Sequence, residues 1–189
     1  MAQLTLAAIQ ALLADNETGD ITPADIRSVI EGVYSPTGWA DYVDTQYTSG
    51  SPFAVTADTD TALPNNAGTV RDTYKPVDVT EFYDGTVITG REGDGINITF
   101  EARAITSSAS GAYIEIWLDI GGAVGEIYRG IWGTFPKGNN IEAGLLRSFS
   151  AYTLDTWESN GATVYVRSNV AMNLYDIRYV ITRTSRANV

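Results

Sequence analysis

The chain of 189 residues contains no histidine and no cysteine. Histidine is the commonest proton shuttle and the base of Ser–His and Cys–His nucleophile systems, so those systems are excluded. Without cysteine the chain can form neither a disulfide framework nor a thiolate metal site. These two absences remove the side chains on which much hydrolytic and thiol-redox chemistry depends.

Basic residues are also scarce. The chain carries 12 Lys and Arg against 23 Asp and Glu, a formal net charge of −11, and its only lysines are Lys75 and Lys137. Proteins that bind nucleic acid neutralise phosphates with clustered Lys and Arg, whereas this chain would repel them. We therefore expect no nucleic-acid partner, and we attribute the acidity to solubility.

Long apolar runs are missing as well. No run approaches the ~18 residues of a membrane-spanning helix. The N-terminus lacks the basic region and the continuous apolar core of a signal peptide. We expect synthesis in a cytoplasm and no insertion into a membrane.

The remaining chemistry would have to come from carboxylates. Asp58 and Asp60 flank Thr59 as at the start of a Ca²⁺ loop, but the third acidic position, the glycine and the closing glutamate are missing. Glu101 and Glu115, on neighbouring predicted strands, could form a glycosidase pair, yet such pairs arise by chance on an acidic sheet. Neither phosphate-binding glycine motif is present. We predict no enzymatic activity, no metal site and no cofactor.

Helical patterns occupy the first fifth of the chain. They predict one helix over residues 3–14 and a second over 23–33, which Thr22 caps. Each is ~12 residues long and too short to be stable alone in water. Their apolar stripes must pack on each other, on sister chains or on a partner surface. The predicted anchor residues are Leu6, Ile9, Leu12, Leu13, Ile26, Val29, Ile30 and Val33.

The composition divides the chain into three parts. Residues 1–38 are predicted to form a helical anchor, and residues 39–52, rich in Gly, Ser, Thr, Asp and Tyr, a linker or arm. Residues 53–189 carry strand and turn patterns and are predicted to form one β-domain.

The strand patterns of this β-domain are regular. Over residues 96–104 and 113–120, apolar and polar residues alternate, which indicates an antiparallel sheet covered on one face. Roughly eight strands without intervening helices predict an all-β antiparallel sandwich, with a jelly roll favoured. The other predicted strands cover 53–57, 77–83, 86–89, 126–135, 145–154, 162–168 and 172–183.

Several segments resemble a β-domain common in bacteriophage fibre and head-decoration proteins. They are residues 57–66 (ADTDTALPNN), 83–85 with 95–98 (YDG and GINI), 128–130 (YRG) and 174–181 (LYDIRYVI). Residues 21–27 (ITPADIR) resemble the short helical segment that precedes such domains in several virion proteins. That domain is similar in form to the tumour-necrosis-factor-like jelly roll, which typically trimerises. The resemblance implies a homotrimeric structural protein and supplies no catalytic residues.

A trimer would also explain one strand that is apolar on both faces. Over residues 126–135, Ile127 and Ile131 oppose Tyr128 and Trp132, and a single jelly roll covers only one face of a strand. The predicted trimer contacts are Tyr128, Trp132, Tyr175 and Tyr179.

Two functions remain open. The first is a capsid decoration (cement) or head-fibre protein on the virion surface, made in the host cytoplasm and docked on the major capsid protein. The alternative is a tail-fibre or receptor-binding tip that binds host surface glycans, although the short predicted linker leaves no long shaft. Sugars could stack on tryptophan, but we expect the core or a subunit interface to hold Trp117, Trp132 and Trp157.

Overall fold

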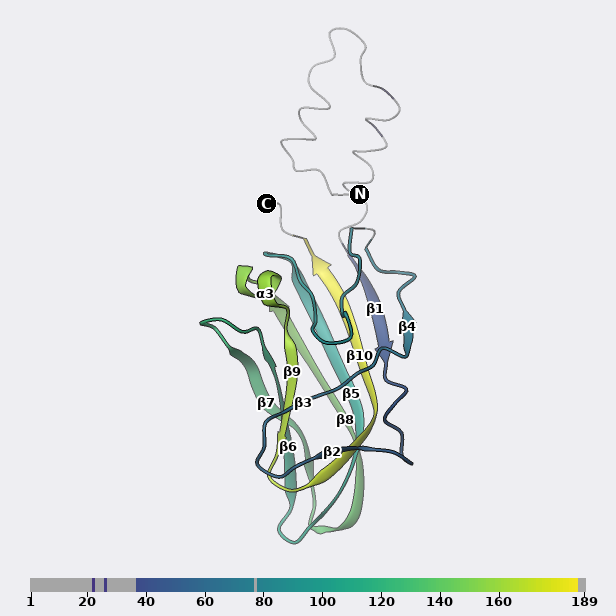
Figure 1. Cartoon of the computed structure of the whole chain (residues 1–189), viewed down its shortest axis with the longest axis vertical. Helices are drawn as coiled ribbons and strands as arrows, with labels where there is room; N and C mark the ends of the chain where they lie inside the picture. Colours follow the sequence, from purple (N-terminus) through teal and green to yellow (C-terminus); the bar gives the residue numbers. More distant parts are fainter. Residues whose placement is uncertain (1–21, 23–25, 27–36, 77, 187–189) are drawn as a thin grey trace.

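Two antiparallel sheets face each other across a shared apolar core (Figure 1). The computed structural model describes residues 22, 26, 37–76 and 78–186. The predicted anchor residues lie outside the described residues, with the exception of Ile26. Ile26 is 49% exposed, and its backbone N–H bonds the carbonyl of Thr22, as in a helical turn.

Long strands build both sheets of the described part of the chain. The larger sheet has six strands, which are β1 (Gly38–Val43), β2 (Phe53–Val55), β4 (Thr69–Arg71), β5 (Gly95–Ser108), β8 (Gly138–Tyr152) and β10 (Met172–Ser185). The smaller sheet has four, which are β3 (Thr61–Ala62), β6 (Ala112–Asp119), β7 (Glu126–Phe135) and β9 (Thr163–Ser168). A short helix, α3 (Asp155–Asn160), connects β8 to β9. No described helix is long and apolar enough to cross a membrane.

The strand order identifies the fold. The larger sheet runs β4-β1-β10-β5-β8, with β2 also paired to β10, and the smaller runs β3-β9-β6-β7. Apart from β6 and β7, neighbouring strands are not consecutive in sequence, and the chain crosses repeatedly between the sheets. This arrangement is the double Greek key of a jelly roll. The predicted all-β sandwich is confirmed.

Alternating residues of the long strands fill the core, as the sequence pattern predicts. The inward side chains of β5 are buried, and aromatic rings from five segments, β5 included, meet in the core. Successive rings are 5.0–5.7 Å apart between centroids and meet edge to face, a favourable arrangement. The rings belong to Tyr42, Tyr83, Tyr179, Phe100 and Phe149.

The predicted linker needs correction, because residues 38–43 form β1. This strand pairs with β10 and places Gly38 opposite Arg183. Ala40 and Tyr42 face the core, but Asp41 between them is fully buried as well. The outward positions of β1 hold the apolar Trp39 and Val43 as well as Asp41, so apolar residues lie on both faces and the sequence shows no clean alternation. The β-domain begins at residue 38, not at residue 53.

The hairpin predicted over 77–83 and 86–89 is reduced to a turn with one isolated bridge. The Asp84 carboxylate accepts backbone N–H groups of Thr86 and Val87, each at 2.8 Å. Tyr83 and Ile88 then pair across this turn. Side-chain bonding by Asp84 shapes the loop, as is usual for aspartate in turns.

Candidate interaction surface

Hydroxyl and amide groups cover part of the outer face of the larger sheet. Strand register places outward residues in rows that cross β1, β10, β5 and β8. The hydroxyls of Thr99 and Ser148 lie 2.8 Å apart across two strands. One row is Trp39, Thr182, Asn97 and Ser150, and the next is Asp41, Val180, Thr99 and Ser148.

Paired charges occupy the middle of this face. The guanidinium of Arg178 donates to both carboxylate oxygens of Asp41, at 2.7 and 3.0 Å, and to Glu101 at 3.0 Å. Arg71, which is largely exposed, also reaches Asp41, at 3.3 Å. The hydrogen bonds that Arg178 donates to Asp41 raise the pKa of Arg178 most; partial burial lowers it, and the bond donated to Glu101 raises it further. Arg178 therefore stays cationic and neutralises the buried Asp41.

A second set of paired charges lies further along the same face. Arg103 bonds Glu142, and the same carboxylate accepts the hydroxyl of Tyr175 at 2.6 Å. The hydrogen bond from Tyr175, followed by that from Arg103, lowers the pKa of Glu142. The three arginines of this face are thus each matched by a carboxylate. On a chain of net charge −11, a face with paired charges limits the repulsion between two copies.

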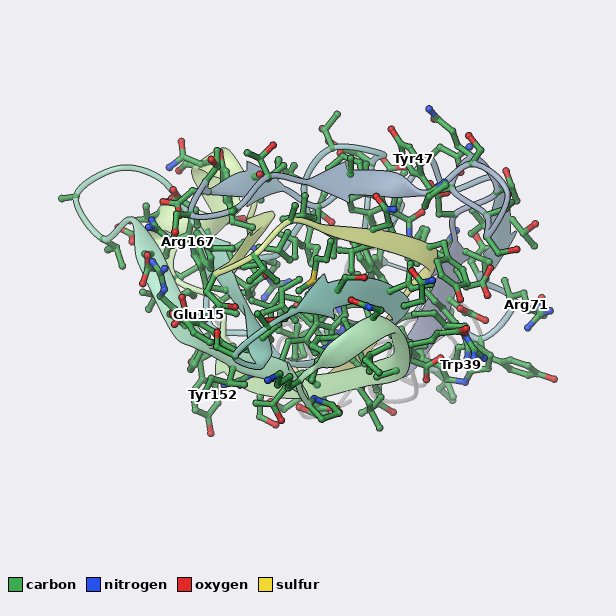
Figure 2. All side chains as sticks on the ribbon, turned by 90° about the horizontal axis from the view of Figure 1, so that it is seen from below. Trp39, Tyr47, Arg71, Glu115, Tyr152 and Arg167 are labelled. Atoms are coloured by element: carbon green, nitrogen blue, oxygen red, sulfur yellow. The ribbon has the colours of Figure 1, made fainter. Side chains whose placement is uncertain are left out.

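An apolar strip borders this face where β7 and β8 meet, and we call it the β7–β8 edge. Arg147 lies over the ring of Phe149, 5.0 Å from its centroid, and donates a hydrogen bond to the carbonyl of Ile131. The large exposed side chains of this edge are Tyr128 (45%) and Ile131 (55%) on β7, and Leu146 (65%) and Tyr152 (75%) on β8, the last two on the same outward side as Ser148. Tyr152 points away from the body of the molecule (Figure 2).

The predicted trimer contacts are placed differently from expectation. Tyr128 is exposed on the β7–β8 edge, but Trp132, Tyr175 and Tyr179 are 5%, 6% and 0% exposed. The Tyr179 hydroxyl donates to the carbonyl of Leu63 at 2.8 Å, deep in the core. Trp132 and Tyr179 point into the core of one chain, whereas Tyr175 lies on the outer face beside Glu142. The role of all four residues in subunit packing stays a prediction.

Bulges in β7 and β10 determine which way these side chains point. The register between β6 and β7 shifts twice, and the extra residue at one shift is Trp132, which turns inward. Tyr128 lies at the second register shift and has a backbone φ of +59°. A shift in β10 between Tyr175 and Arg178 leaves Tyr175 on the outer face and Tyr179 in the core. Alternation in sequence gives no sign of these bulges.

The outer face of the smaller sheet is covered by its own side chains. Trp117 lies between Tyr165, with ring centroids 5.8 Å apart and planes 14° apart, and Arg129, 4.2 Å from the ring centroid. Arg129 also bonds Glu115 at 2.9 Å. Trp117 is therefore 3% exposed, and Trp157 is fully buried. The expectation of a core position is confirmed for Trp132 and Trp157, whereas Trp117 is buried on the outer face by Tyr165 and Arg129.

The carboxylate sites weighed in the sequence do not come together. Glu101 lies in the larger sheet and Glu115 in the smaller, so they do not form a pair across neighbouring strands. Asp58 and Asp60 both bond Arg167, at 3.5 and 3.3 Å. Figure 2 shows Arg167 and Glu115 on the smaller-sheet side. Within residues 37–76 and 78–186 no group of three or more acidic side chains is arranged to hold a metal.

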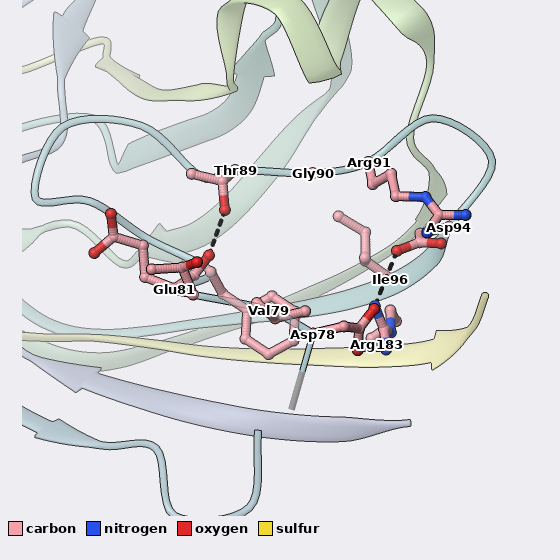
Figure 3. Close-up of a pocket in the computed structure, with 11 residues that line it drawn as sticks. Asp78, Val79, Glu81, Thr89, Gly90, Arg91, Asp94, Ile96 and Arg183 are labelled. Atoms are coloured by element: carbon pink, nitrogen blue, oxygen red, sulfur yellow. Dashed lines mark hydrogen bonds and ion pairs between the residues drawn. The ribbon is translucent and has the colours of Figure 1, made fainter. Parts of the chain in front are cut away.

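A pocket of about 280 Å³ lies at the end of the sandwich where β1 begins and β10 ends (Figure 3). Val79, Phe82 and Ile96 supply its apolar lining. At its charged side, Arg183 bonds both oxygens of Asp78, at 2.6 and 2.9 Å.

The charges of this pocket are matched among themselves. Arg183, 1% exposed, also reaches Asp94 at 3.3 Å, and Arg186 bonds Asp78 at 2.6 Å. Burial raises the pKa of Asp78, but hydrogen bonds and charge from Arg183 and Arg186 outweigh burial and lower it. Asp78 is therefore ionised and arginine-bound at neutral pH, which suits a clamp for the 78–94 loop and not a proton-transfer site.

No protein family model matches the chain, and no curated protein sequence matches it. Among solved structures, it is similar to Eiger TNF from S. frugiperda, with 9% identity over 80% of this chain and 95% of that chain and a TM-score of 0.45. It is similar to the PRD1 vertex protein P5, with 12% identity over 80% and 74% of the two chains and a TM-score of 0.44. A chain of the infectious bursal disease virus Gx strain matches with 11% identity over 69% and 32% and a TM-score of 0.33. At these values the likenesses assign no function, and the fold rests on the strand order.

Proposed function

We propose that this protein is a structural, non-enzymatic component of a bacteriophage particle, a capsid decoration (cement) or head-fibre protein on the virion surface. It acts as a homotrimer that projects its sandwich outward and docks on the major capsid protein through its N-terminal segment. The sequence resemblance of residues 57–66 and 174–181 supports the virion assignment. The observation that carries the trimer is the charge-paired outer face beside the exposed β7–β8 edge.

The β7–β8 edge and the outer face of the larger sheet could pack against each other in a closed ring of copies. The β7–β8 edge carries exposed apolar side chains, and the outer face of the larger sheet has its charges paired, so the edge of one copy could pack on the face of the next. Contact between two different patches is heterologous, and a rotation that closes makes a cyclic oligomer. Three copies would close such a ring in the proposed trimer.

The docking segment can be tested by charge placement. The double change Ile9→Asp with Leu13→Asp puts two charges into the predicted apolar stripe of the first helix. We expect this variant to keep its oligomeric mass in light scattering and to lose binding to capsids that lack the protein. The matched control is Gln3→Asp with Gln10→Asp, which adds the same charge off the stripe. Full decoration by the Ile9/Leu13 variant would refute the anchor.

A tail-fibre or receptor-binding tip that binds host surface glycans is the second candidate. The exposed stacked pair Trp39 and Tyr74, 36% and 68% exposed, lies at the end where β1 begins. An uncharged cavity at the opposite end of the sandwich, where β10 begins, favours this candidate. Binding of the purified protein to tails or to host cells, and not to capsids, would select it.

A further inference from the structure

A cavity of about 360 Å³ opens at the far end of the larger sheet, where β10 begins and β5 ends. About 35 Å of strand, at ~3.3 Å per residue, separates Gly95 from Thr106 along β5. This cavity and the pocket lined by Arg183 therefore lie at opposite ends of the sandwich. Strand β2 forms one wall by pairing with the start of β10. Figure 1 shows β2 at the end of the sandwich opposite the start of β1.

The lining contains no ionisable side chain. It combines hydroxyl and amide groups with small apolar surfaces, which are Thr56, Ser107, Asn140 and Asn173 beside Ala54 and Ile105. Glu142, which pairs with Ile105 in the ladder, is held by Arg103 and does not line the cavity. On a chain with 23 acidic residues, an uncharged cavity of this size is a distinct chemical environment.

Two side-chain amides give this cavity its hydrogen-bonding capacity. The side chains of Asn140 and Asn173 make no hydrogen bond to another residue of the described chain, and each amide offers an acceptor oxygen and two donor hydrogens. The Asn140 backbone donates to the Ser107 hydroxyl at 2.9 Å and so fixes that wall. Asn140 lies at a register shift of β8 and has a φ of +52°, a conformation that asparagine tolerates better than most residues. This bulge presents its amide at the cavity.

We propose that this cavity binds an uncharged sugar unit of a glycan. A pyranose ring presents hydroxyls that both donate and accept, matching two amides and two hydroxyls, and an aliphatic face that fits Ala54 and Ile105. The volume lies in the range of about 300–1,000 Å³ typical of small-molecule sites. Charged sugars are disfavoured, because the lining offers no cation and the chain is strongly acidic. The site does not depend on docking to a capsid.

The test is ligand-observed NMR on the full-length protein. The probes are galactose, glucose, mannose and N-acetylglucosamine, with glucuronic and N-acetylneuraminic acids as charged counterparts. We expect at least one neutral sugar to bind, at least about fivefold more tightly than either acid. Binding to no neutral sugar, or equal binding of the acids, would overturn the proposal.

Variants locate the binding to the cavity. Asn140→Gly with Asn173→Ala removes both amides, and glycine keeps the left-handed backbone; we expect affinity to fall about tenfold or more. Asn139→Gly is the matched control, since Asn139 precedes Asn140 and does not line this cavity. Ala54→Trp fills the space and should abolish binding. Wild-type affinity in the double variant would refute the site, whereas capsid binding by the same variants tests the structural role separately.

Discussion

The guanidinium of Arg178 in β10 donates two hydrogen bonds to the fully buried carboxylate of Asp41 in β1, across 137 positions of sequence. This pair ties the first described strand of the sandwich to the last. It also keeps a charge buried on the sheet face that we propose to meet another copy.

Arg178→Met should destabilise the fold, because it leaves the Asp41 carboxylate buried with only the exposed Arg71 nearby. Loss of one partner from a buried ion pair costs 3–5 kcal/mol. Because 36% of the Arg178 side chain is exposed, we expect about 2–3 kcal/mol by urea denaturation. Arg71→Met is the control and should cost less than about 1 kcal/mol. Equal losses for the two variants would contradict this account of Asp41.

Stability should fall in acid partly through Asp78. Its pKa is lowered in the folded chain, because Arg183 and Arg186 outweigh the effect of burial. Such a carboxyl adds stability above its unfolded pKa of about 4, and the contribution is lost as the pH falls through the lower folded pKa. The stability difference between wild type and Asp78→Asn should therefore be largest near neutral pH and shrink below about pH 4. Urea titrations across this range measure it, with the exposed Asp58→Asn as control; a difference independent of pH would exclude this linkage.

Leu146→Asp should dissociate the proposed trimer. Leu146 is 65% exposed on the β7–β8 edge, so a charge there leaves the fold of one chain intact while opposing burial against a second. Light scattering should report a monomer, with thermal unfolding otherwise preserved. Val124→Asp changes a residue of similar exposure in the β6–β7 turn and should leave the mass unchanged. A wild-type mass for Leu146→Asp would remove this edge from the interface.

Tyr179→Phe separates a core role from an interface role. The change deletes the hydroxyl that bonds the Leu63 carbonyl and leaves a buried acceptor unpaired, which costs about 1–2 kcal/mol. Denaturation should show this loss, and light scattering should show no change in mass. The opposite pattern, a smaller oligomer of unchanged stability, would return Tyr179 to the interface.

Much of the fold could be predicted because its strands obey simple alternation. Residues 126–135 form β7 with the predicted bounds, and β5 and β6 follow the apolar–polar pattern closely. The sequence concealed β1, since its outward positions hold Trp39 and Val43 beside Asp41 and the pattern does not separate a polar face from an apolar one.

The candidate surface was less predictable than the fold. Whether Tyr175 or Tyr179 faces outward depends on a bulge between them, and bulges have no periodic signature. The exposure of Leu146 and Tyr152 depends on β8 lying at the edge of its sheet, which only the strand order reveals. The uncharged far-end cavity likewise joins residues from four separate segments.

The pairing of Gly38 with Arg183 has a mechanical consequence, because β1 starts and β10 finishes at one end of the sandwich. A load pulling residues 38 and 186 apart would peel β1 from β10, breaking the perpendicular ladder bonds one pair at a time. A load carried from that end to the far end runs along β5, β8 and β10, and it shears all their ladder bonds together. The sandwich should therefore resist tension along its length better than a force that separates β1 from β10 at the end where residues 38 and 186 lie.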